Sequence, residues 1–389
     1  MTRTPATMPL EGVLVADFSR VLAGPLAAVM LADLGATVVK VERPLVGDDT
    51  RQWGPPWTNG SSSYYQCANR SKSSVTLDLD DPDDLRLAKE LARRADVILE
   101  NFPEGSLARR RLDHESVRTT NPGVVYCSIS GFGSGAGASM GGYDFLVQAM
   151  GGLMSISGEP SGEPMNTGVA VVDVLTAKDA TFGVLAALAA RDRTGEGQRV
   201  EVNLLSSLLG SLANQASAYL TTGIAPRRRG NQHPSIAPYE TLTCKDQVLA
   251  VACGNDRQFH RLAAVIGAPH LASDKRFATN ARRVENRASL VAELESRLVR
   301  ETAEVWAQRL TAVSVPAGRL GSIADGIALA ESLGLEPTVE VGDSLPRQIR
   351  HPVTYSATPV TTYRHPPGLG EHDADVRHWL SATTEENTA

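Results

Sequence analysis

Short apolar runs alternate with helical segments over the first half of the chain, and this alternation restricts the fold more than any other feature. Strand-like runs occur at residues 12–17, 36–41, 97–99 and 124–129, and residues 199–204 alternate as a strand does. Helical periodicity occurs at residues 24–34, 82–95 (with Asp81 as the N-cap) and 174–191. Uninterrupted apolar runs are typical of strands that are buried on both faces, and strands that alternate with helices indicate a parallel sheet. We therefore predict an α/β fold.

The second half of the chain has a different pattern. Residues 205–225 are predicted to be helical, and the basic Pro/Gly stretch at residues 225–230 indicates a domain boundary. Residues 235–320 suggest a smaller α+β module, with a hairpin around Lys245-Asp246 and helices near residues 256–266 and 285–310. The chain has 389 residues, which fits two domains at about 150 residues each.

Composition and charge exclude several classes of function. The formal net charge is −6 and aromatic residues make up 5% of the chain, whereas nucleic-acid binders carry a basic surface and stacking aromatics. The chain contains neither a secretory h-region nor an uncharged apolar run of about 18 residues, so we expect a cytoplasmic protein with no membrane partner. The four cysteines, Cys67, Cys127, Cys244 and Cys253, are scattered; we expect them to be buried, reduced and inert, with no metal site.

Two local motifs have ordinary interpretations. The glycine-rich segment from Gly131 to Gly137 follows a predicted strand, as in a dinucleotide-binding fingerprint. Its glycines continue into residues 138–142, which are poor at starting a helix, so a loop is favoured over an NAD site. The basic run Arg227, Arg228 and Arg229 is interpreted as a solvated linker.

Asp173 is the acid that most suggests chemistry. It follows the apolar run at residues 169–172 and precedes the predicted helix at residues 174–191. The residue could be an ordinary helix N-cap, which stabilises by ~1 kcal/mol. It could instead be a carboxylate nucleophile at a helix N-terminus, where apolar neighbours would keep water away from an acyl intermediate. Composition alone favours the N-cap.

A series of short motifs spans nearly the whole chain. They are Pro9-Leu10-Glu11-Gly12, Val15-Ala16-Asp17-Phe18, Ala23-Gly24-Pro25, Val39-Lys40-Val41-Glu42-Arg43, Glu100-Asn101-Phe102-Pro103-Glu104-Gly105, Gly142-Tyr143-Asp144 with Gln148-Ala149, the Asp173 helix with Thr194-Gly195-Glu196-Gly197-Gln198, and Leu369-Gly370-Glu371-His372. In this order and spacing the chain resembles the class III CoA-transferases, the formyl-CoA transferase-like or CaiB/BaiF type. This resemblance moves the interpretation of Asp173 from N-cap to nucleophile.

The resemblance implies a fold and an assembly. The expected homodimer consists of two interlocked rings, each with a Rossmann-like large domain and a small α+β domain. The large domain would comprise residues 1–205 and 325–389, the small domain residues 226–320, and residues 206–225 the linker.

The resemblance also implies a chemistry. Asp173 would attack an acyl-CoA thioester and carry the acyl group during exchange with a free carboxylic acid. Coenzyme A would be substrate and product, with no prosthetic group and no metal. The family's CoA-contacting positions correspond to Val21, Leu22, Arg43, Leu77, Asn101, Phe102, Arg109 and Tyr143. Arg43 and Arg109 suit the CoA phosphates because guanidinium groups bind phosphate bidentately; by themselves they would suggest surface ion pairs, with Glu42 or Glu104.

The expected substrate contacts are in the segment Gly230, Asn231, Gln232 and His233, which resembles the family's mobile glycine loop but has a single glycine. Gly141 replaces a lysine of formyl-CoA transferases, which disfavours a formyl/oxalyl pair. Succinyl-CoA or another dicarboxylyl thioester is the expected donor, and the acceptor pocket is expected around Tyr64, Tyr143, His233 and Tyr239.

Two alternatives stay open at this stage. An α-methylacyl-CoA racemase would resemble this chain, but such enzymes have a histidine at the position of Tyr143. A tyrosine, with a pKa near ~10, is a poor partner in two-base proton exchange. The other alternative is a CoA-binding protein without catalytic activity. The sequence specifies neither the acceptor acid nor the pathway.

Overall fold

The computed structural model describes residues 8–58, 60–343 and 345–382. Within it the chain divides into two compact units. The large unit comprises Met1–Leu153, Asn166–Ile224 and Glu336–Ala389, and the small unit comprises Met154–Met165 and Ala225–Leu335.

A six-stranded sheet with the order β5-β2-β1-β6-β7-β8 is the centre of the large unit, and all its neighbouring strands are parallel. Its strands are β1 (Leu14–Asp17), β2 (Thr37–Glu42), β5 (Lys72–Thr76), β6 (Val97–Glu100), β7 (Val125–Ser130) and β8 (Gln198–Asn203). The predicted α/β fold with a parallel sheet is confirmed.

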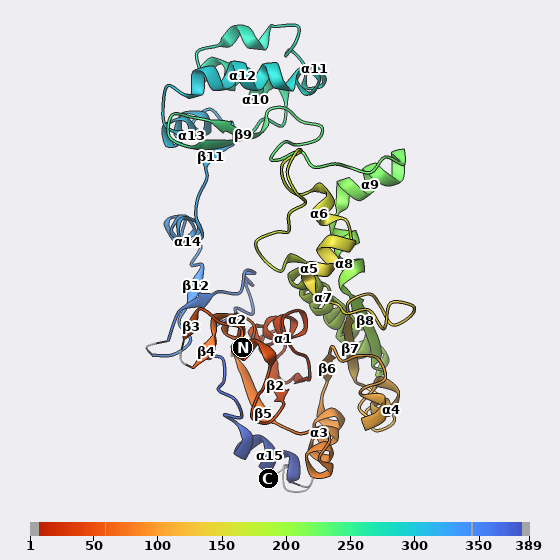
Figure 1. Cartoon of the computed structure of the whole chain (residues 1–389). Helices are drawn as coiled ribbons and strands as arrows, with labels where there is room; N and C mark the ends of the chain where they lie inside the picture. The colour runs from red at the N-terminus through yellow and green to blue at the C-terminus, as the bar shows by residue number, and fades with distance from the viewer. Residues whose placement is uncertain (1–7, 59, 344, 383–389) are drawn as a thin grey trace. The chain divides into compact units, whose positions relative to one another are not determined.

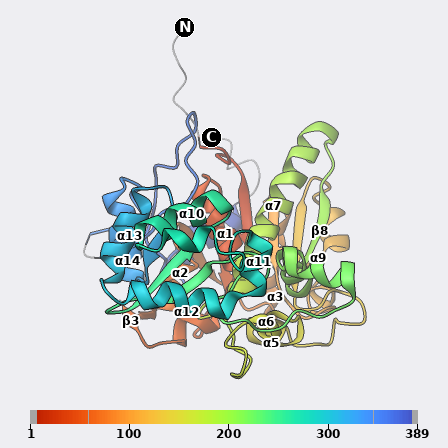
Figure 2. The same cartoon turned by 90° about the horizontal axis from the view of Figure 1, so that it is seen from above.

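Helices cover both faces of this sheet. Val15 and its neighbours on one face pack into a core with α1 (Ala23–Asp33), α7 (Val171–Thr194) and α8 (Leu204–Ser211). Ala16 and its neighbours on the other face pack with α3 (Pro82–Arg94), α4 (His114–Arg118) and α15 (Asp373–Ser381). Figure 1 shows α3 and α15 side by side although they are far apart in the sequence. Figure 2 shows α7 running beside β8.

The remaining elements of the large unit are short or lie in connections. They are η1 (Asp49–Gln52), β3 (Trp57–Thr58), β4 (Ser61–Ser62), α2 (Ser63–Cys67), η2 (Ala108–Arg110), α5 (Asp144–Met150), α9 (Ala213–Thr222), β12 (Thr338–Val339) and β13 (Gln348–Ile349). The short helix α6 (Leu153–Ile156) has its first residue in the large unit and the others in the small unit. Residues 206–225, expected as a linker, lie almost entirely in α8 and α9.

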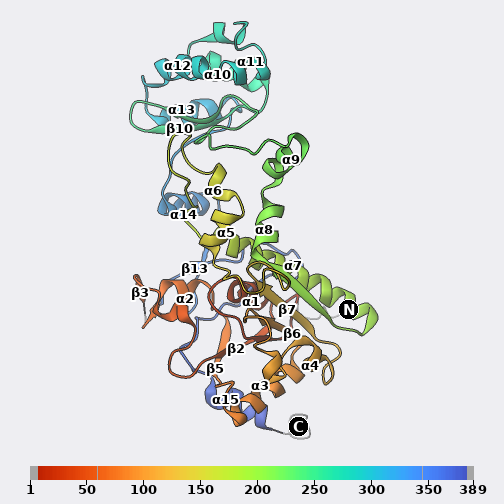
Figure 3. The same ribbon diagram turned by 45° about the vertical axis from the view of Figure 1, so that its right-hand side comes forward.

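The small unit has an α+β architecture. Its three-stranded antiparallel sheet has the order β11-β10-β9, from β9 (Tyr239–Thr243), β10 (Val248–Ala252) and β11 (Ala317–Arg319). The hairpin predicted at Lys245-Asp246 joins β9 to β10. The helices are α10 (Asp256–Val265), η3 (Pro269–Ala272), α11 (Asn280–Glu285), α12 (Arg287–Leu298), α13 (Ala303–Thr311) and α14 (Ile323–Ser332). Figure 3 shows α10, α11, α12 and α13 grouped together.

Most of the predicted boundaries hold to within a few residues. Asp81 caps α3 as predicted, its side chain accepting hydrogen bonds from the N–H groups of Asp83 and Asp84. The helix predicted at residues 174–191 begins three residues earlier, at Val171. The single helical region predicted at 285–310 is two helices, α12 and α13.

Three cysteines are buried, but Cys67 is exposed on α2, so the prediction of burial is wrong for that residue. In the part of the chain that the structure describes, every helix is too short or too polar to cross a membrane.

Candidate active site

A cavity of about 620 Å³ opens at the carboxyl ends of β6, β7 and β8, beside the N-terminus of α1. Its lining comes from residues 20–23, 100–104, 128–131, 133–134, 138–143, 173, 199 and 201–204. In parallel α/β sheets ligands bind outside the carboxyl ends of the strands. The position of this cavity therefore follows from the sheet topology.

Asp173 lines this cavity from the first turn of α7. The N-cap residue of that helix is Ala170, which makes no side-chain capping bond, so the interpretation of Asp173 as the N-cap is wrong. The residue is only 9% exposed. Among residues 8–58, 60–343 and 345–382 nothing donates a hydrogen bond to its carboxylate, and no cation pairs with it. Its oxygens are not among the fully buried side-chain atoms that lack a partner, so the carboxylate is open to the cavity that it lines.

Burial raises the pKa of Asp173 to about 7, and the negative charge of Asp144 adds to the effect. Near neutral pH, such a carboxyl is part ionised and part protonated. A desolvated carboxylate at a cavity wall suits nucleophilic attack, because strongly perturbed carboxyl groups in clefts are typical of functional sites. Tyr64 on α2 is close enough that Asp173, after burial, contributes to a pKa of about 12 for its phenol.

Five of the eight predicted CoA contacts line the same cavity as Asp173: Val21, Leu22, Asn101, Phe102 and Tyr143. Val21 has a positive φ of 71°, which is rare for a β-branched residue. Its N–H donates to the Asp48 carboxylate at 3.3 Å. The Asn101 side chain forms two hydrogen bonds with the backbone of Arg20, accepting from its N–H at 2.9 Å and donating to its carbonyl at 2.8 Å. Hydrogen bonds with the side chains of Asp48 and Asn101 thus hold the strained turn in place.

A second cavity, of about 420 Å³, accounts for two more of the predicted contacts. Arg43 and Leu77 line it together with Phe102, which belongs to both cavities. Arg43 pairs with Asp49 at 2.7 Å, so the expected partner Glu42 is wrong; Glu42 instead pairs with Arg51. Arg109 is exposed and lines neither cavity.

The predicted substrate segment belongs to the small unit, where hydrogen bonds hold its residues in place. Gly230 N–H donates to Gly158, Gln232 N–H to Arg229, and His233 N–H to Tyr239. The Asn231 side chain donates to the Thr241 hydroxyl at 3.0 Å. Arg228, expected to be solvated, donates to the carbonyls of Glu159 and Gly162.

The glycine-rich segment after β7 forms part of the cavity wall. The next helix, α5, begins only at Asp144, which does not match a dinucleotide fingerprint. A Cβ on Gly131 would lie 2.3 Å from the Cα of Gly142. These two glycines therefore allow the backbone to fold closely on itself at the cavity mouth.

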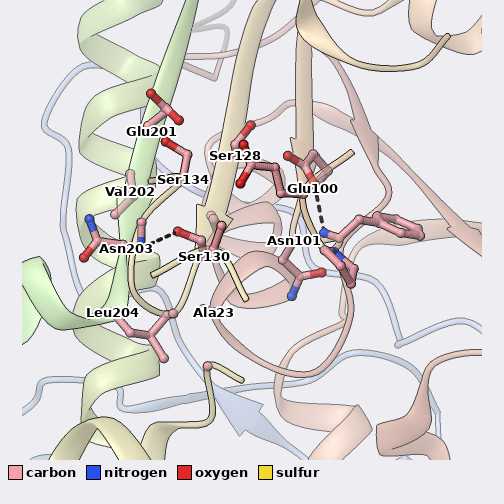
Figure 4. Close-up of a pocket in the computed structure, with 18 of the residues that line it drawn as sticks. Ala23, Glu100, Asn101, Ser128, Ser130, Ser134, Glu201, Val202, Asn203 and Leu204 are labelled. Carbon is pink, nitrogen blue, oxygen red and sulfur yellow. Dashed lines mark hydrogen bonds between the residues drawn. The ribbon is translucent and has the colours of Figure 1, made fainter. Parts of the chain in front are cut away.

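Sequence reasoning missed a polar row on the cavity wall. Glu100, Ser128 and Glu201 are paired in register across β6, β7 and β8, and Figure 4 shows their side chains on neighbouring strands. Burial raises the pKa of Glu100. Arg199 on β8 pairs with Glu201 at 3.0 Å. Glu100 ends β6, whereas Ser128 and Glu201 lie inside β7 and β8, so only the strand register brings the three side chains into one row.

Sequence analysis also did not single out four charged side chains that are buried in the large unit, near the strained turn at Val21. Lys40 pairs with Asp48 at 2.9 Å and Lys72 with Asp17 at 2.8 Å, all four essentially inaccessible to solvent. Burial lowers the pKa of Lys72 to about 8, against the opposing effect of Asp17. Within the described residues no group of three or more His, Cys, Asp or Glu side chains is arranged to hold a metal ion.

The model of CoA-transferase family III matches residues 10–373, and the chain belongs to this family. It is 44% identical to the succinate–glutarate CoA-transferase of Agrobacterium fabrum, over 98% of this chain and 97% of that protein. It is 37% identical to the succinyl-CoA:glutarate CoA-transferase of Homo sapiens, over 95% of this chain and 85% of that protein. A crystal structure of a CaiB/BaiF family protein from Brucella suis has a TM-score of 0.88 and 41% identity, over 96% of this chain and all of that one. The resemblance inferred from the motifs is confirmed, and the protein is a family III CoA-transferase.

Proposed function

We propose that this CoA-transferase moves CoA from succinyl-CoA to another dicarboxylic acid, such as glutarate, through a covalent intermediate on Asp173. The unbonded, buried Asp173 carboxylate on the cavity wall is the observation that carries the catalytic part of the proposal. The substrates are proposed because the relatives with 44% and 37% identity are named for succinate or succinyl-CoA and glutarate.

The exchange uses Asp173 as both nucleophile and acyl carrier. Its oxygen attacks the thioester carbonyl, the C–S bond breaks, and CoA thiolate leaves a mixed anhydride behind. The thiolate then attacks the aspartyl carbonyl and expels the donor acid, which gives an aspartyl-CoA thioester. The acceptor carboxylate attacks that thioester and releases thiolate, and attack of the thiolate on the acceptor carbonyl yields the new acyl-CoA and regenerates Asp173. Every intermediate remains an activated acyl group.

For CoA we propose a path through both cavities of the large unit. Val21, Leu22, Asn101, Phe102 and Tyr143 would contact the arm that brings the thioester to Asp173. Arg43 and Leu77 would contact the nucleotide end, with Phe102 lining both cavities. Arg43 and Arg109 supply guanidinium groups suited to phosphate.

We further propose the assembly that the family resemblance implies, an interlocked homodimer in the cytoplasm with large domain 1–205 and 325–389, small domain 226–320, and Gly230–His233 at the acceptor. Exposed apolar side chains on one short helix support an interface: Phe145, Leu146 and Met150 on α5 are 56%, 42% and 61% exposed. A contiguous exposed apolar patch is typical of a surface that a partner covers.

The test is a panel of acyl-CoAs and free acids, with new thioesters followed by mass spectrometry. We expect succinyl-CoA plus glutarate to yield glutaryl-CoA, and hydroxylamine to trap acyl groups on Asp173. Asp173→Ala should abolish transfer and trapping while CoA binding stays within about an order of magnitude. The matched control is Asp179→Asn, an exposed acid on the same helix. Full turnover by Asp173→Ala would refute the covalent mechanism.

The racemase alternative has less support. The position that would hold its histidine is Tyr143, which is 60% exposed, and no histidine lines the cavity. A racemase would incorporate solvent deuterium at the α-carbon of an acyl-CoA in the absence of an acceptor acid; we expect no such exchange. A CoA-binding protein without activity would protect CoA but yield no trapped acyl-enzyme.

A further inference from the structure

The first turn of α7 has an unusual distribution of hydrogen bonds. Val171 N–H donates to Val169, and Val174 N–H donates to Ala170. The two remaining amides, of Val172 and Asp173, both donate to Oδ1 of Asp144, at 2.7 and 3.1 Å. The cap of α7 is therefore a side chain from another helix, α5, that lies 29 residues earlier than Asp173 in the sequence.

An acid in the first helical turn ordinarily benefits from the free amides at the helix N-terminus. Asp173 cannot do so here, because Asp144 already accepts from those amides. As a result, the Asp173 carboxylate lines the cavity and has no hydrogen-bond donor among the described residues.

The position of Asp144 is itself fixed by a buried glutamine. The Nε2 of Gln148, one turn along α5, donates to Oδ2 of Asp144 at 2.6 Å. The Oε1 of Gln148 accepts from Thr167 N–H at 3.0 Å, and Gln148 has no exposed surface. The two oxygens of Asp144 therefore have separate partners, and the same glutamine anchors the segment that leads into α7.

We propose that Asp144 is a positioning residue that occupies the free amides of α7 and so keeps the Asp173 carboxylate unbonded, facing the cavity and ready to attack. This inference rests on the proposed function of Asp173 and explains the motif Gly142-Tyr143-Asp144 with Gln148. The charge of Asp144 also disfavours the ionised form of Asp173, adding to the effect of burial. Both effects make Asp173 a more basic nucleophile than an aspartate at a free helix N-terminus.

Other titratable groups lie near Asp173. Tyr64 on α2 is within electrostatic range of it, and its pKa is raised to about 12 by burial first and the charge of Asp173 second, so the phenol stays neutral through the working range. Arg199 and Glu201 on β8 pair with each other on the cavity wall. Tyr126 and Cys127 on β7 are buried, with raised pKa values. α8 carries no titratable side chain, and Asp33 at the end of α1 pairs with Arg70.

The experiment compares wild type, Asp144→Asn and Asp144→Ala over about pH 5 to 9, with rates of acyl transfer and hydroxylamine trapping of the acyl-enzyme. The asparagine keeps an oxygen that accepts from the two amides but removes the charge. We expect the acid limb of its kcat/KM profile to move to lower pH by about one unit. For Asp144→Ala we expect kcat to fall by roughly tenfold or more, with KM for acyl-CoA within about threefold, and Asp144→Asn to restore part of kcat.

Asp144→Ser, which keeps a shorter uncharged acceptor, is the second variant if the asparagine form folds poorly, and the same shift is expected. The matched control is Asp81→Asn, because the Asp81 side chain also accepts from two first-turn amides, those of its own helix α3, but is outside the cavity; the pH profile of this variant should match wild type. If wild type forms a trapped acyl-enzyme but an uncharged variant keeps the wild-type acid limb, the positioning role of Asp144 is overturned and the proposed function survives. If wild type forms none, the proposed function fails, and this inference with it.

Discussion

The buried carboxyl of Asp173 should make the folded protein less stable as pH rises. In the folded chain burial raises its pKa to about 7, against an ordinary value of 3.8. Between these values the folded state holds a proton that the unfolded state has lost. Stability therefore falls as pH increases through this window, and the loss is complete above the folded-state pKa.

The variant Asp173→Asn isolates this effect, because asparagine has nearly the same shape and cannot ionise. A pKa displaced by about 3 pH units, at about 1.36 kcal/mol per unit, corresponds to ~4 kcal/mol above pH 8. This is an upper bound, since water entry and relaxation reduce the cost of ionisation. We expect the variant to be more stable than wild type at pH 8, and the difference to shrink as pH falls toward about 4.

The assay is the thermal unfolding midpoint of both proteins at matched concentration across this pH range. A chain of 389 residues shifts by about 1–2 °C per kcal/mol, so a few degrees are expected at pH 8 and almost none at the acid end. Asp179→Asn, which removes an exposed acid from the same helix, should show no such trend. A difference between Asp173→Asn and wild type that stays constant with pH would refute the desolvation argument.

Three further expectations follow from the structure. Wild-type kcat/KM should fall as pH drops below about 7, because protonation of Asp173 removes the attacking carboxylate; initial rates across pH measure this, and a flat profile would contradict it. Lys72→Met should lower the free energy of unfolding by about 3–5 kcal/mol, because it removes the ion-pair partner of the buried Asp17 carboxylate. Urea titration at neutral pH measures this free energy, and a change below about 1 kcal/mol would contradict the expectation. Gly197→Ala should cost about 1–3 kcal/mol, because its Cβ would lie 2.1 Å from the Val124 carbonyl oxygen; the comparison is Gly210→Ala, where a Cβ meets nothing within 4 Å.

Apart from the alternating β8, the strands of the large sheet that sequence analysis identified are apolar runs. β1 and β2 are continuous runs because both sheet faces are covered. The strand β5 was not predicted, since Lys72–Thr76 reads as a polar segment. It is nevertheless buried, because the Lys72 ammonium has partners in Asp17, Asn69 and the Pro25 carbonyl. A hydrophobic pattern cannot indicate a strand whose burial depends on ion pairs with residues distant in the sequence.

In the candidate site, too, sequence analysis identified the residue with a local signal and failed where contacts with residues distant in the sequence decide the structure. Asp173 could be selected from the sequence because its helix is long and the family motifs surround it. The interpretation of Asp173 as an N-cap failed because the cap is supplied by Asp144, through backbone amides that carry no sequence signature. Likewise Arg43 was assigned the neighbouring Glu42 as its partner, whereas the fold gives Glu42 to Arg51 and Arg43 to Asp49.

The turn at Val21 shows why local sequence could not define the cavity. A valine at a φ of 71° is strained, and such a conformation persists only when the surroundings impose it. Here Asp48 accepts from the Val21 amide, while Lys40 donates both to Asp48 and to the Ser19 carbonyl. Lys40 and Asp48 are buried, so neither can exchange its partner for water. The backbone that lines the cavity beside Asp173 is therefore held by charges that lie 19 to 27 residues away along the chain, and their role becomes apparent only once β1 and β2 are paired.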